Sequence, residues 1–184
     1  MKSALVGKSR TLGFLALFTI AFGSGCGGRQ GPGAASGGEE GEHTLIGAPA
    51  PTFELPSRSG DGKVALAEAS GKVVIVDFWA TWCEPCRDSF PVYQRMADKF
   101  DGKLIVIGVS VDEEPDGIAK FAADTGAKFD LVWDEGQVLS ERYKPPTMPT
   151  SYILDKNGVV RFVHAGFKSG DDAKIESEVS SLVD

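Results

Sequence analysis

The stretch that organises this chain is Val73-Val74-Ile75-Val76-Asp77-Phe78-Trp79-Ala80-Thr81-Trp82-Cys83-Glu84-Pro85-Cys86. Its first seven residues are apolar except for Asp77, and four of them are valine or isoleucine. This composition is typical of a strand that is buried on both faces of a sheet. The strand leads directly to a Cys-x-x-Cys pair, so we expect the chemistry of the chain to lie where the strand ends.

Apolar residues continue beyond the second cysteine at helical spacing. At intervals of four, three, four and three residues they are Cys86, Phe90, Tyr93, Ala97 and Phe100. This pattern predicts a helix over 83–100 with one apolar stripe and with Cys83 near its N-terminus. Pro85 suits an early helical position, where no backbone N–H is needed.

The start of a helix gives the two cysteines different chemistry. The unpaired N–H groups of the first turn carry partial positive charge, which stabilises a thiolate over a thiol. We therefore expect Cys83 to be the nucleophile. Cys86 lies one turn further in, on the apolar stripe, so we expect it to be more buried and to have a higher pKa. From there it can attack a mixed disulfide formed at Cys83 and close the pair into a disulfide.

The stretch from Val76 to Cys86 resembles the active site of the thioredoxin superfamily, and Pro91 falls where thioredoxins kink this helix. A longer match runs from Pro49-Ala50-Pro51 through this stretch to residues 152–158. It resembles the TlpA/ResA/DsbE-like branch of membrane-tethered, extracytoplasmic thiol-disulfide oxidoreductases. The resemblance covers about residues 46–183 and implies an α/β thioredoxin fold, a mixed central sheet with helices on both faces.

Hydrophobic periodicity in the rest of the chain agrees with that fold. The expected elements are strands over 64–66, 104–111, 131–133, 150–154 and 159–165, and helices over 115–125, 138–143 and 171–182. Asn157-Gly158 between two β-rich runs predicts an antiparallel hairpin. Parallel strands joined through helices, together with this hairpin, make a mixed sheet.

The N-terminal residues have the pattern of an export signal. Lys2, Lys8 and Arg10 precede an apolar run of about a dozen residues, shorter than the roughly 20 that span a bilayer as a helix. Small residues then lead to Cys26, as in bacterial lipoprotein signals, although Gly23 stands where such signals usually have leucine. We expect a signal peptide over 1–25 and a lipid on Cys26; ordinary cleaved secretion is the alternative.

The cysteine count favours the lipid. Of three cysteines, Cys26 is left over once Cys83 and Cys86 pair, and a free thiol in an exported protein is open to oxidation. Residues 26–44 are rich in glycine and poor in apolar side chains, so they should form a flexible, lipid-anchored tether. Residues 45–184 have the size of one thioredoxin-like domain.

The composition is acidic. The chain has 19 Lys and Arg against 26 Asp and Glu, a net charge of −7. Cleavage before Cys26 would remove three basic residues and leave a net charge of −10. This argues against nucleic acid and against electrostatic attachment to anionic lipid. We expect a monomer with no metal and no cofactor beyond the redox-active disulfide Cys83–Cys86.

Asp77 lies six residues before Cys83, where the superfamily often has a buried acid. The flanking valines indicate a poorly solvated carboxyl group with a raised pKa, able to take the proton from Cys86. The alternative is an aspartate held by local hydrogen bonds without kinetic effect. ResA-like members carry a glutamate three residues after the second cysteine, but this chain has Ser89 there, so a relay role is not carried over.

Met148-Pro149-Thr150 resembles the loop that sets a cis proline against the active-site cysteines. The resemblance implies that Met148 and Pro149 bind an extended client segment, with the N–H and C=O of Met148 exposed to it. The alternative is a trans proline that only begins a strand. Pro145 and Pro146 are rivals for the cis bond, but Pro149 directly precedes the strand.

Side chains around the cysteines should bind clients or tune the redox pair. Trp82 is expected on the surface beside Cys83 as an apolar docking plane, and Trp79 in the core. Glu84 places a negative charge beside Cys83, which opposes the helix N-terminus and makes the thiolate less stable. Because a less stable reduced form means a lower potential, the Glu84-Pro85 pair predicts a potential near the reducing end of the range.

Two other functions are open on the same fold. Copper delivery uses two cysteines and a histidine as soft ligands, but His164, the one histidine of the expected domain, has the strand position of a packed structural residue. A thiol peroxidase needs one activated cysteine, and here a second cysteine competes for that thiolate. Asp112, Glu113, Glu114 and Asp116 form an acidic cluster after the strand over 104–111, which is expected to be a solvated loop. Calcium binding is not expected there, since the cluster lacks EF-hand spacing.

The residues and the resemblance together predict extracytoplasmic thiol-disulfide exchange through Cys83 and Cys86. The expected location is a bacterial membrane facing the periplasm, and the expected direction is reduction of disulfides in exported protein clients. Cytochrome c maturation is one such client pathway. No cytosolic glutathione pool reaches that compartment, so a membrane electron donor must reset the pair.

Overall fold

The computed structural model describes residues 43–184. The expected signal peptide over 1–25, the lipidation site Cys26 and nearly all of the expected tether lie outside the described residues.

Strands and helices alternate along this part of the chain. The strands are β1 (Glu54–Pro56), β2 (Lys63–Ala65), β3 (Val73–Trp79), β4 (Leu104–Ser110), β5 (Asp130–Trp133), β6 (Thr150–Leu154) and β7 (Val160–Ala165). The α-helices are α1 (Glu84–Phe100), α2 (Ile118–Thr125), α3 (Val138–Tyr143) and α4 (Asp171–Val183). Short 3-10 helices are η1 (Leu66–Ala69), η2 (Pro115–Gly117) and η3 (Glu135–Gln137).

Five strands form one mixed sheet in the order β5-β4-β3-β6-β7. β3 pairs in parallel with β4, and β4 with β5, whereas β6 is antiparallel to both β3 and β7. The β6–β7 hairpin turns at Gly158, whose φ of 75° is a left-handed conformation that glycine adopts without strain. The mixed sheet and the hairpin predicted from the sequence are confirmed.

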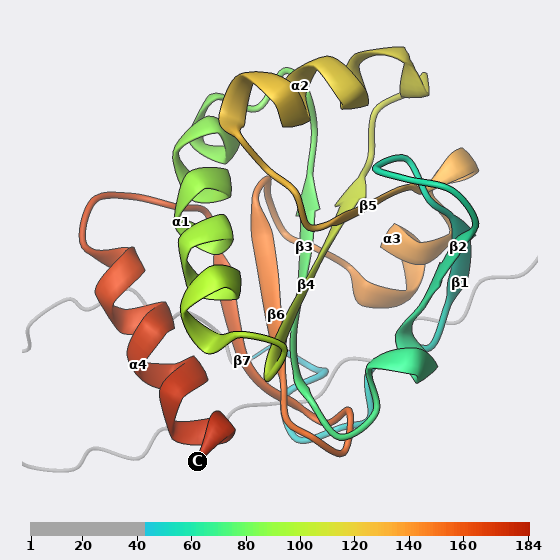
Figure 1. The fold of residues 1–184 in the computed structure, drawn as a ribbon. Coiled ribbons are helices and arrows are strands. Elements are labelled where there is room, and N and C mark those ends of the chain that lie inside the picture. Colours follow the sequence, from blue (N-terminus) through green and yellow to red (C-terminus); the bar gives the residue numbers. More distant parts are fainter. Residues whose placement is uncertain (1–42) are drawn as a thin grey trace, which may run out of the picture. The chain divides into compact units, whose positions relative to one another are not determined.

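Helices cover both faces of this sheet, with α1 and α4 on one side and α3 on the other (Figure 1). Alternate side chains of β3 reach the two layers. The Trp79 ring packs on Phe90 of α1 with centroids 4.7 Å apart, and the Phe78 ring packs on Tyr143 of α3 at 5.1 Å. Every residue of β3 is buried, because helices close over both faces of the central strand.

β1 and α2 are among the elements that differ from the sequence prediction. β1 was not predicted, because it has only three residues and its two outer residues are exposed, which leaves no apolar alternation to detect. It pairs with β2 in a separate two-stranded sheet. The helix predicted over 115–125 opens as η2, and α2 begins only at Ile118. Gly117, a poor helix former, is the last residue of η2 and the N-cap residue of α2.

Candidate active site

Cys83 and Cys86 form a disulfide with an S–S distance of 2.01 Å and a Cα–Cα distance of 5.3 Å. Cys83 is the N-cap residue of α1, and its carbonyl oxygen accepts a hydrogen bond from the N–H of Cys86. The pair therefore lies between the end of β3 and the first turn of α1. A thiolate at Cys83 would face the positive end of the helix dipole.

The two cysteines differ little in burial while they are bonded. Cys86 is fully buried and Cys83 is 3% exposed. Ser89, which takes the position of the glutamate found in ResA-like members, is also buried, and its hydroxyl donates to the Cys86 carbonyl oxygen at 3.2 Å. In this chain that position supports the first turn of α1 and supplies no carboxyl group.

The turn before Cys83 is held by Asp112, which follows β4. The Asp112 carboxylate accepts hydrogen bonds from the Thr81 N–H at 3.0 Å, the Thr81 hydroxyl at 2.8 Å and the Ser110 hydroxyl at 2.8 Å. Asp112 is only 8% exposed, so assigning it to a solvated acidic loop was wrong. The parallel pairing of β3 and β4 brings the ends of both strands to one edge, and that adjacency was the available signal.

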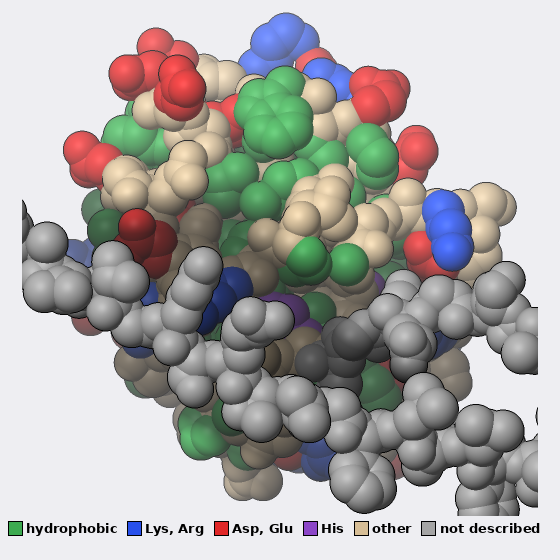
Figure 2. Space-filling view, turned by 180° about the vertical axis from the view of Figure 1, so that it is seen from behind, with side chains coloured by type: hydrophobic (Ala, Val, Ile, Leu, Met, Phe, Trp, Pro, Cys, Tyr) green, Lys and Arg blue, Asp and Glu red, His purple; other side chains and the backbone are tan. Residues whose placement is uncertain are grey.

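The two tryptophans of this region separate as predicted. Trp82 is 71% exposed and follows the turn that Asp112 holds, directly before Cys83. Trp79 is fully buried between α1 and α2, with its ring 4.5 Å from that of Phe121. A space-filling view shows hydrophobic side chains gathered on one face, with acidic side chains around them (Figure 2). An exposed apolar ring beside a reactive sulfur is suited to contact a protein client.

Asp77 is fully buried on β3, as predicted. Its Oδ1 atom accepts a hydrogen bond of 2.7 Å from the Ser151 hydroxyl, and its Oδ2 atom has no hydrogen-bond partner among the described residues. Burial raises the pKa of Asp77 to about 8, against the opposing effect of the Ser151 hydrogen bond. A carboxyl group with this pKa can exchange a proton near neutral pH.

The Met148–Pro149 peptide bond is cis. Thr150 pairs with Phe78, so Met148 and Pro149 lie at the same end of β3 as the cysteines. Pro149 is buried and its carbonyl oxygen accepts a hydrogen bond from the Gly166 N–H at 2.7 Å, whereas Met148 is half-buried. Backbone pairing on both sides thus fixes the loop at the active-site edge of the sheet.

Glu84 and Pro85 occupy the first turn of α1 and are both exposed. The Glu84 side chain is 89% exposed, and its Oε2 atom lies 3.8 Å from the Nε of Arg87. Water and this neighbouring cation both weaken the field of the Glu84 charge at Cys83. We therefore expect the effect of Glu84 on the potential to be small.

His164 pairs with Glu178 of α4 across the face of the sheet that α1 also covers. Within residues 43–184 the structure places no three His, Cys, Asp or Glu side chains together in a group that could hold a metal ion. His164 is thus engaged in a contact between β7 and α4, which is the packed role predicted for it.

Tyr93 and Ser151 belong to the site but were not singled out from the sequence. The Tyr93 hydroxyl lies 2.5 Å from Ser151 Oγ, which in turn bonds Asp77. Tyr93 was counted only as part of the apolar stripe of α1. The available signal was Ser151 itself, a polar residue in a fully buried strand that pairs with the strand of Asp77.

The central strand of the sheet, β3, begins a parallel β-α-β unit and ends at a disulfide-forming Cys-x-x-Cys pair on the first turn of the next helix. This arrangement defines a thioredoxin-fold thiol-disulfide oxidoreductase. Residues 46–163 match the AhpC/TSA family, and the chain belongs to that family. Among proteins of known name, it is 35% identical over 120 residues to the thioredoxin-like protein YneN of Bacillus subtilis (strain 168). That match covers 64% of this chain and 69% of the relative.

Further relatives agree with this assignment. The thiol-disulfide oxidoreductase ResA of Geobacillus kaustophilus (strain HTA426) is 30% identical over 138 residues, covering 74% of this chain and 78% of the relative. A crystal structure described as a putative thiol:disulfide interchange protein DsbE from Chlorobium tepidum superposes with a TM-score of 0.72 at 35% identity. It covers 76% of this chain and 98% of that chain.

These matches place the chain in the TlpA/ResA/DsbE-like branch of the thioredoxin superfamily. It is an enzyme of disulfide exchange, and the relatives favour this activity over the peroxidase and copper-delivery alternatives. The helices of the described part are all too short or too polar to cross a membrane.

Proposed function

We propose that this protein is an extracytoplasmic disulfide reductant for exported proteins, reset by a membrane electron donor. The observation that carries the proposal is the Cys83–Cys86 disulfide at the N-terminus of α1, beside the exposed Trp82. This site combines a cysteine pair that can carry two electrons with an exposed apolar ring that can contact a protein client.

The reaction begins at Cys83. Its thiolate attacks one sulfur of a client disulfide, forms a mixed disulfide with that sulfur and releases the other client sulfur as a thiolate. The positive end of α1 stabilises the attacking thiolate. Trp82 contacts the client, and the backbone of Met148 pairs with an extended client segment next to Pro149.

The second step belongs to Cys86. Its thiol gives a proton to Asp77, and the resulting thiolate attacks Cys83 Sγ in the mixed disulfide. The Cys83–Cys86 disulfide forms and the second client sulfur leaves as a thiolate, which takes a proton from water. Two electrons have passed from the protein to the client, so a donor must return two electrons to the pair.

The proposed location rests on the N-terminal sequence. The apolar run and the small residues before Cys26 support export and lipid attachment, and the glycine-rich residues after Cys26 support a tether. Electrons would then come from a donor in the same membrane. We propose a monomer, because one chain supplies every residue of the site described above.

Client trapping tests the activity. The full chain with Cys86→Ala should accumulate mixed disulfides with exported proteins, because the resolving thiol is gone, and mass spectrometry identifies the clients, including any apocytochrome c. Cys83→Ser should trap none and should not reduce insulin disulfides. A Cys83→Ser protein that still reduces insulin would show that Cys83 is not the nucleophile.

A further inference from the structure

Two buried hydroxyl groups form a chain that ends at the Asp77 carboxyl group. Ser151 Oγ lies 2.7 Å from Asp77 Oδ1, and the Tyr93 hydroxyl oxygen lies 2.5 Å from Ser151 Oγ. None of the three side chains is more than 1% exposed. Because an ionised carboxylate can only accept, Ser151 then donates to Asp77, and its oxygen accepts from the Tyr93 hydroxyl.

This chain joins three elements of the active-site layer. Asp77 is on β3, Ser151 is directly opposite it on β6, and Tyr93 is on α1. Tyr93 lies seven residues after Cys86, two turns along the same face of the helix. The hydroxyl chain therefore connects the helix that carries Cys86 to the strand that carries its proposed proton acceptor.

Among the described residues, the Ser151 hydroxyl is the one hydrogen-bond partner of this carboxyl group. On β4 the residue paired with Asp77 is Gly108, which has no side chain. On β7 His164 pairs with Ser151 in the sheet register, and its ring is bonded to Glu178 of α4. Asp171, at the start of α4, acts on Tyr93: together with burial and the Asp77 charge it raises the pKa of that phenol.

We propose that Ser151 and Tyr93 are positioning residues that hold the Asp77 carboxyl group and direct it to accept the Cys86 proton on Oδ2. This inference rests on the proposed function, in which Asp77 is the proton acceptor. Ser151 occupies Oδ1 and leaves Oδ2 as the carboxylate oxygen without a partner among the described residues. Tyr93 bonds the Ser151 oxygen and so keeps the Ser151 hydrogen directed at Asp77.

The hydroxyl chain also offsets part of the cost of burying a charge. A hydrogen bond to an ionised group stabilises that ionised form, so Ser151 lowers the pKa of Asp77 while burial raises it. Without Ser151 the carboxyl group would stay protonated to higher pH. A smaller fraction of Asp77 would then be ionised and able to accept a proton at neutral pH, and resolution of the mixed disulfide would slow.

Carbon-13 NMR of the Asp77 carboxyl group in the oxidised full chain tests this without relying on activity. Ser151→Ala should raise the titration midpoint of Asp77 by about one to two pH units. Tyr93→Phe should raise it by a smaller amount, and Ser151→Thr should restore it. The matched control is Tyr143→Phe on the other face of the sheet. It removes a buried phenol hydroxyl that donates to the Pro51 carbonyl oxygen, and it should leave the titration midpoint of Asp77 unchanged.

The kinetic readout is the pH profile of mixed-disulfide resolution, measured in single turnover. The rate should rise with pH and level off above the Asp77 midpoint, and Ser151→Ala should move that rise to higher pH by the same amount. In an Asp77→Asn background, Ser151→Ala should no longer move the profile.

The outcomes separate this inference from the proposed function. An Asp77 midpoint that stays at its wild-type value in Ser151→Ala overturns the positioning roles, whatever the activity. If Ser151→Ala does not fold, Tyr93→Phe, which keeps its ring in the core, decides the question in the same way. A midpoint that moves while the kinetic profile does not would instead overturn the role of Asp77 in the reaction.

Discussion

Asp77 couples the stability of the protein to pH. Burial raises its pKa from 3.8 to about 8, so the folded protein keeps a proton that the unfolded chain has already lost at neutral pH. Unfolding then releases a proton, and stability must fall as pH rises from about 4 to about 8 and level off above that. The reason is that the buried site disfavours the ionised form of Asp77.

Asp77→Asn should remove this pH-dependent cost. We expect the oxidised variant to be more stable than the wild type by roughly 3–5 kcal/mol at pH 9 and nearly unchanged at pH 4. Urea unfolding at both pH values measures the difference, with the exposed Asp61→Asn as control. Equal gains at the two pH values would mean that ionisation of Asp77 is not the cause.

Glu84 tests how far one exposed charge tunes the redox pair. Glu84→His should make the potential less negative and lower the pKa of Cys83, because a negative charge near the thiolate is removed. An exposed charge is worth about 0.2–1 kcal/mol, which corresponds to roughly 5–20 mV for this two-electron couple. Equilibration with dithiothreitol or glutathione measures the potential, and thiolate absorbance against pH measures the pKa.

Glu68→His, on η1 at the opposite end of β3, is the control for the Glu84 experiment and should not change the potential. A more negative potential in Glu84→His would contradict the electrostatic argument. The wild-type value decides the direction of the proposed function. The proposed reductant role requires a value near the thioredoxin reference of about −270 mV, and a value close to about −120 mV would show an oxidant.

Between elements, Gly108 on β4 leaves room for the side chains of Trp79 on β3 and Leu131 on β5. A Cβ atom at Gly108 would lie 2.7 Å from Leu131 Cδ2 and 3.0 Å from Trp79 Nε1. Both neighbours are fully buried, so they have little room to move. The absent side chain leaves space for the indole ring, which packs against Phe90 of α1 and Phe121 of α2.

Gly108→Ala should therefore destabilise the protein by about 1–3 kcal/mol through overpacking. Gly60→Ala is the matched control: its nearest contact would be 4.0 Å away, and its stability should change little. Thermal and urea unfolding of the oxidised proteins measure both. Equal stabilities for the two variants would show that the Trp79 layer can relax without cost.

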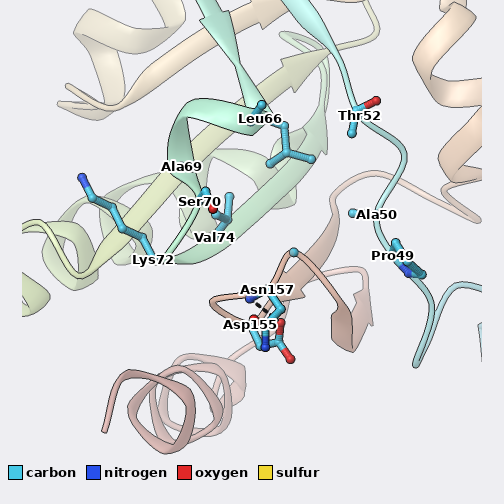
Figure 3. A pocket seen from close by; sticks show the side chains of 12 residues that line it. Pro49, Ala50, Thr52, Leu66, Ala69, Ser70, Lys72, Val74, Asp155 and Asn157 are labelled. Atoms are coloured by element: carbon cyan, nitrogen blue, oxygen red, sulfur yellow. Dashed lines mark hydrogen bonds between the residues drawn. The ribbon is translucent and has the colours of Figure 1, made fainter.

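A cavity of about 270 Å³ lies far from the cysteines, at the end of the sheet where β3 begins (Figure 3). The loop of Pro49 and Ala50, the η1 segment and the turn at Asp155 and Asn157 line it. Asp155 is fully engaged there, since its carboxylate accepts from the N–H groups of Asn157 and Val159. The cavity lies at one end of β3, whereas the redox pair Cys83–Cys86 follows the other end.

For the whole molecule, the proposed lipid on Cys26 would decide where the domain works. In the full chain produced in a bacterium, Cys26→Ser should move the protein from the membrane fraction to the soluble fraction, because the proposed lipid anchor would be lost. Insulin reduction by the purified variant should match the wild type, since the exchanging pair is intact. Fractionation with mass spectrometry of the N-terminus checks this; a wild type that is soluble would show ordinary secretion.

The sequence alone determined the elements with long, strong patterns. β3 and β6 have the predicted bounds, and α1 follows the predicted apolar stripe, because burial on one or both faces leaves a regular hydrophobic period in the chain. The disulfide pair and the burial of Asp77 also followed from local order. β1 carried too little pattern to be detected, since it is short and mostly exposed.

Only the tertiary structure decided which distant residues meet. Asp112 supports Thr81 across 31 residues, and Tyr93 reaches Ser151 across 58. Nothing in local sequence ranks such contacts, because they depend on strand register and on how α1 lies over the sheet. The same is true of Glu84: its charge was visible in the sequence, but its exposure was set by the packing of the folded chain. That exposure is why we expect only a small effect on the potential.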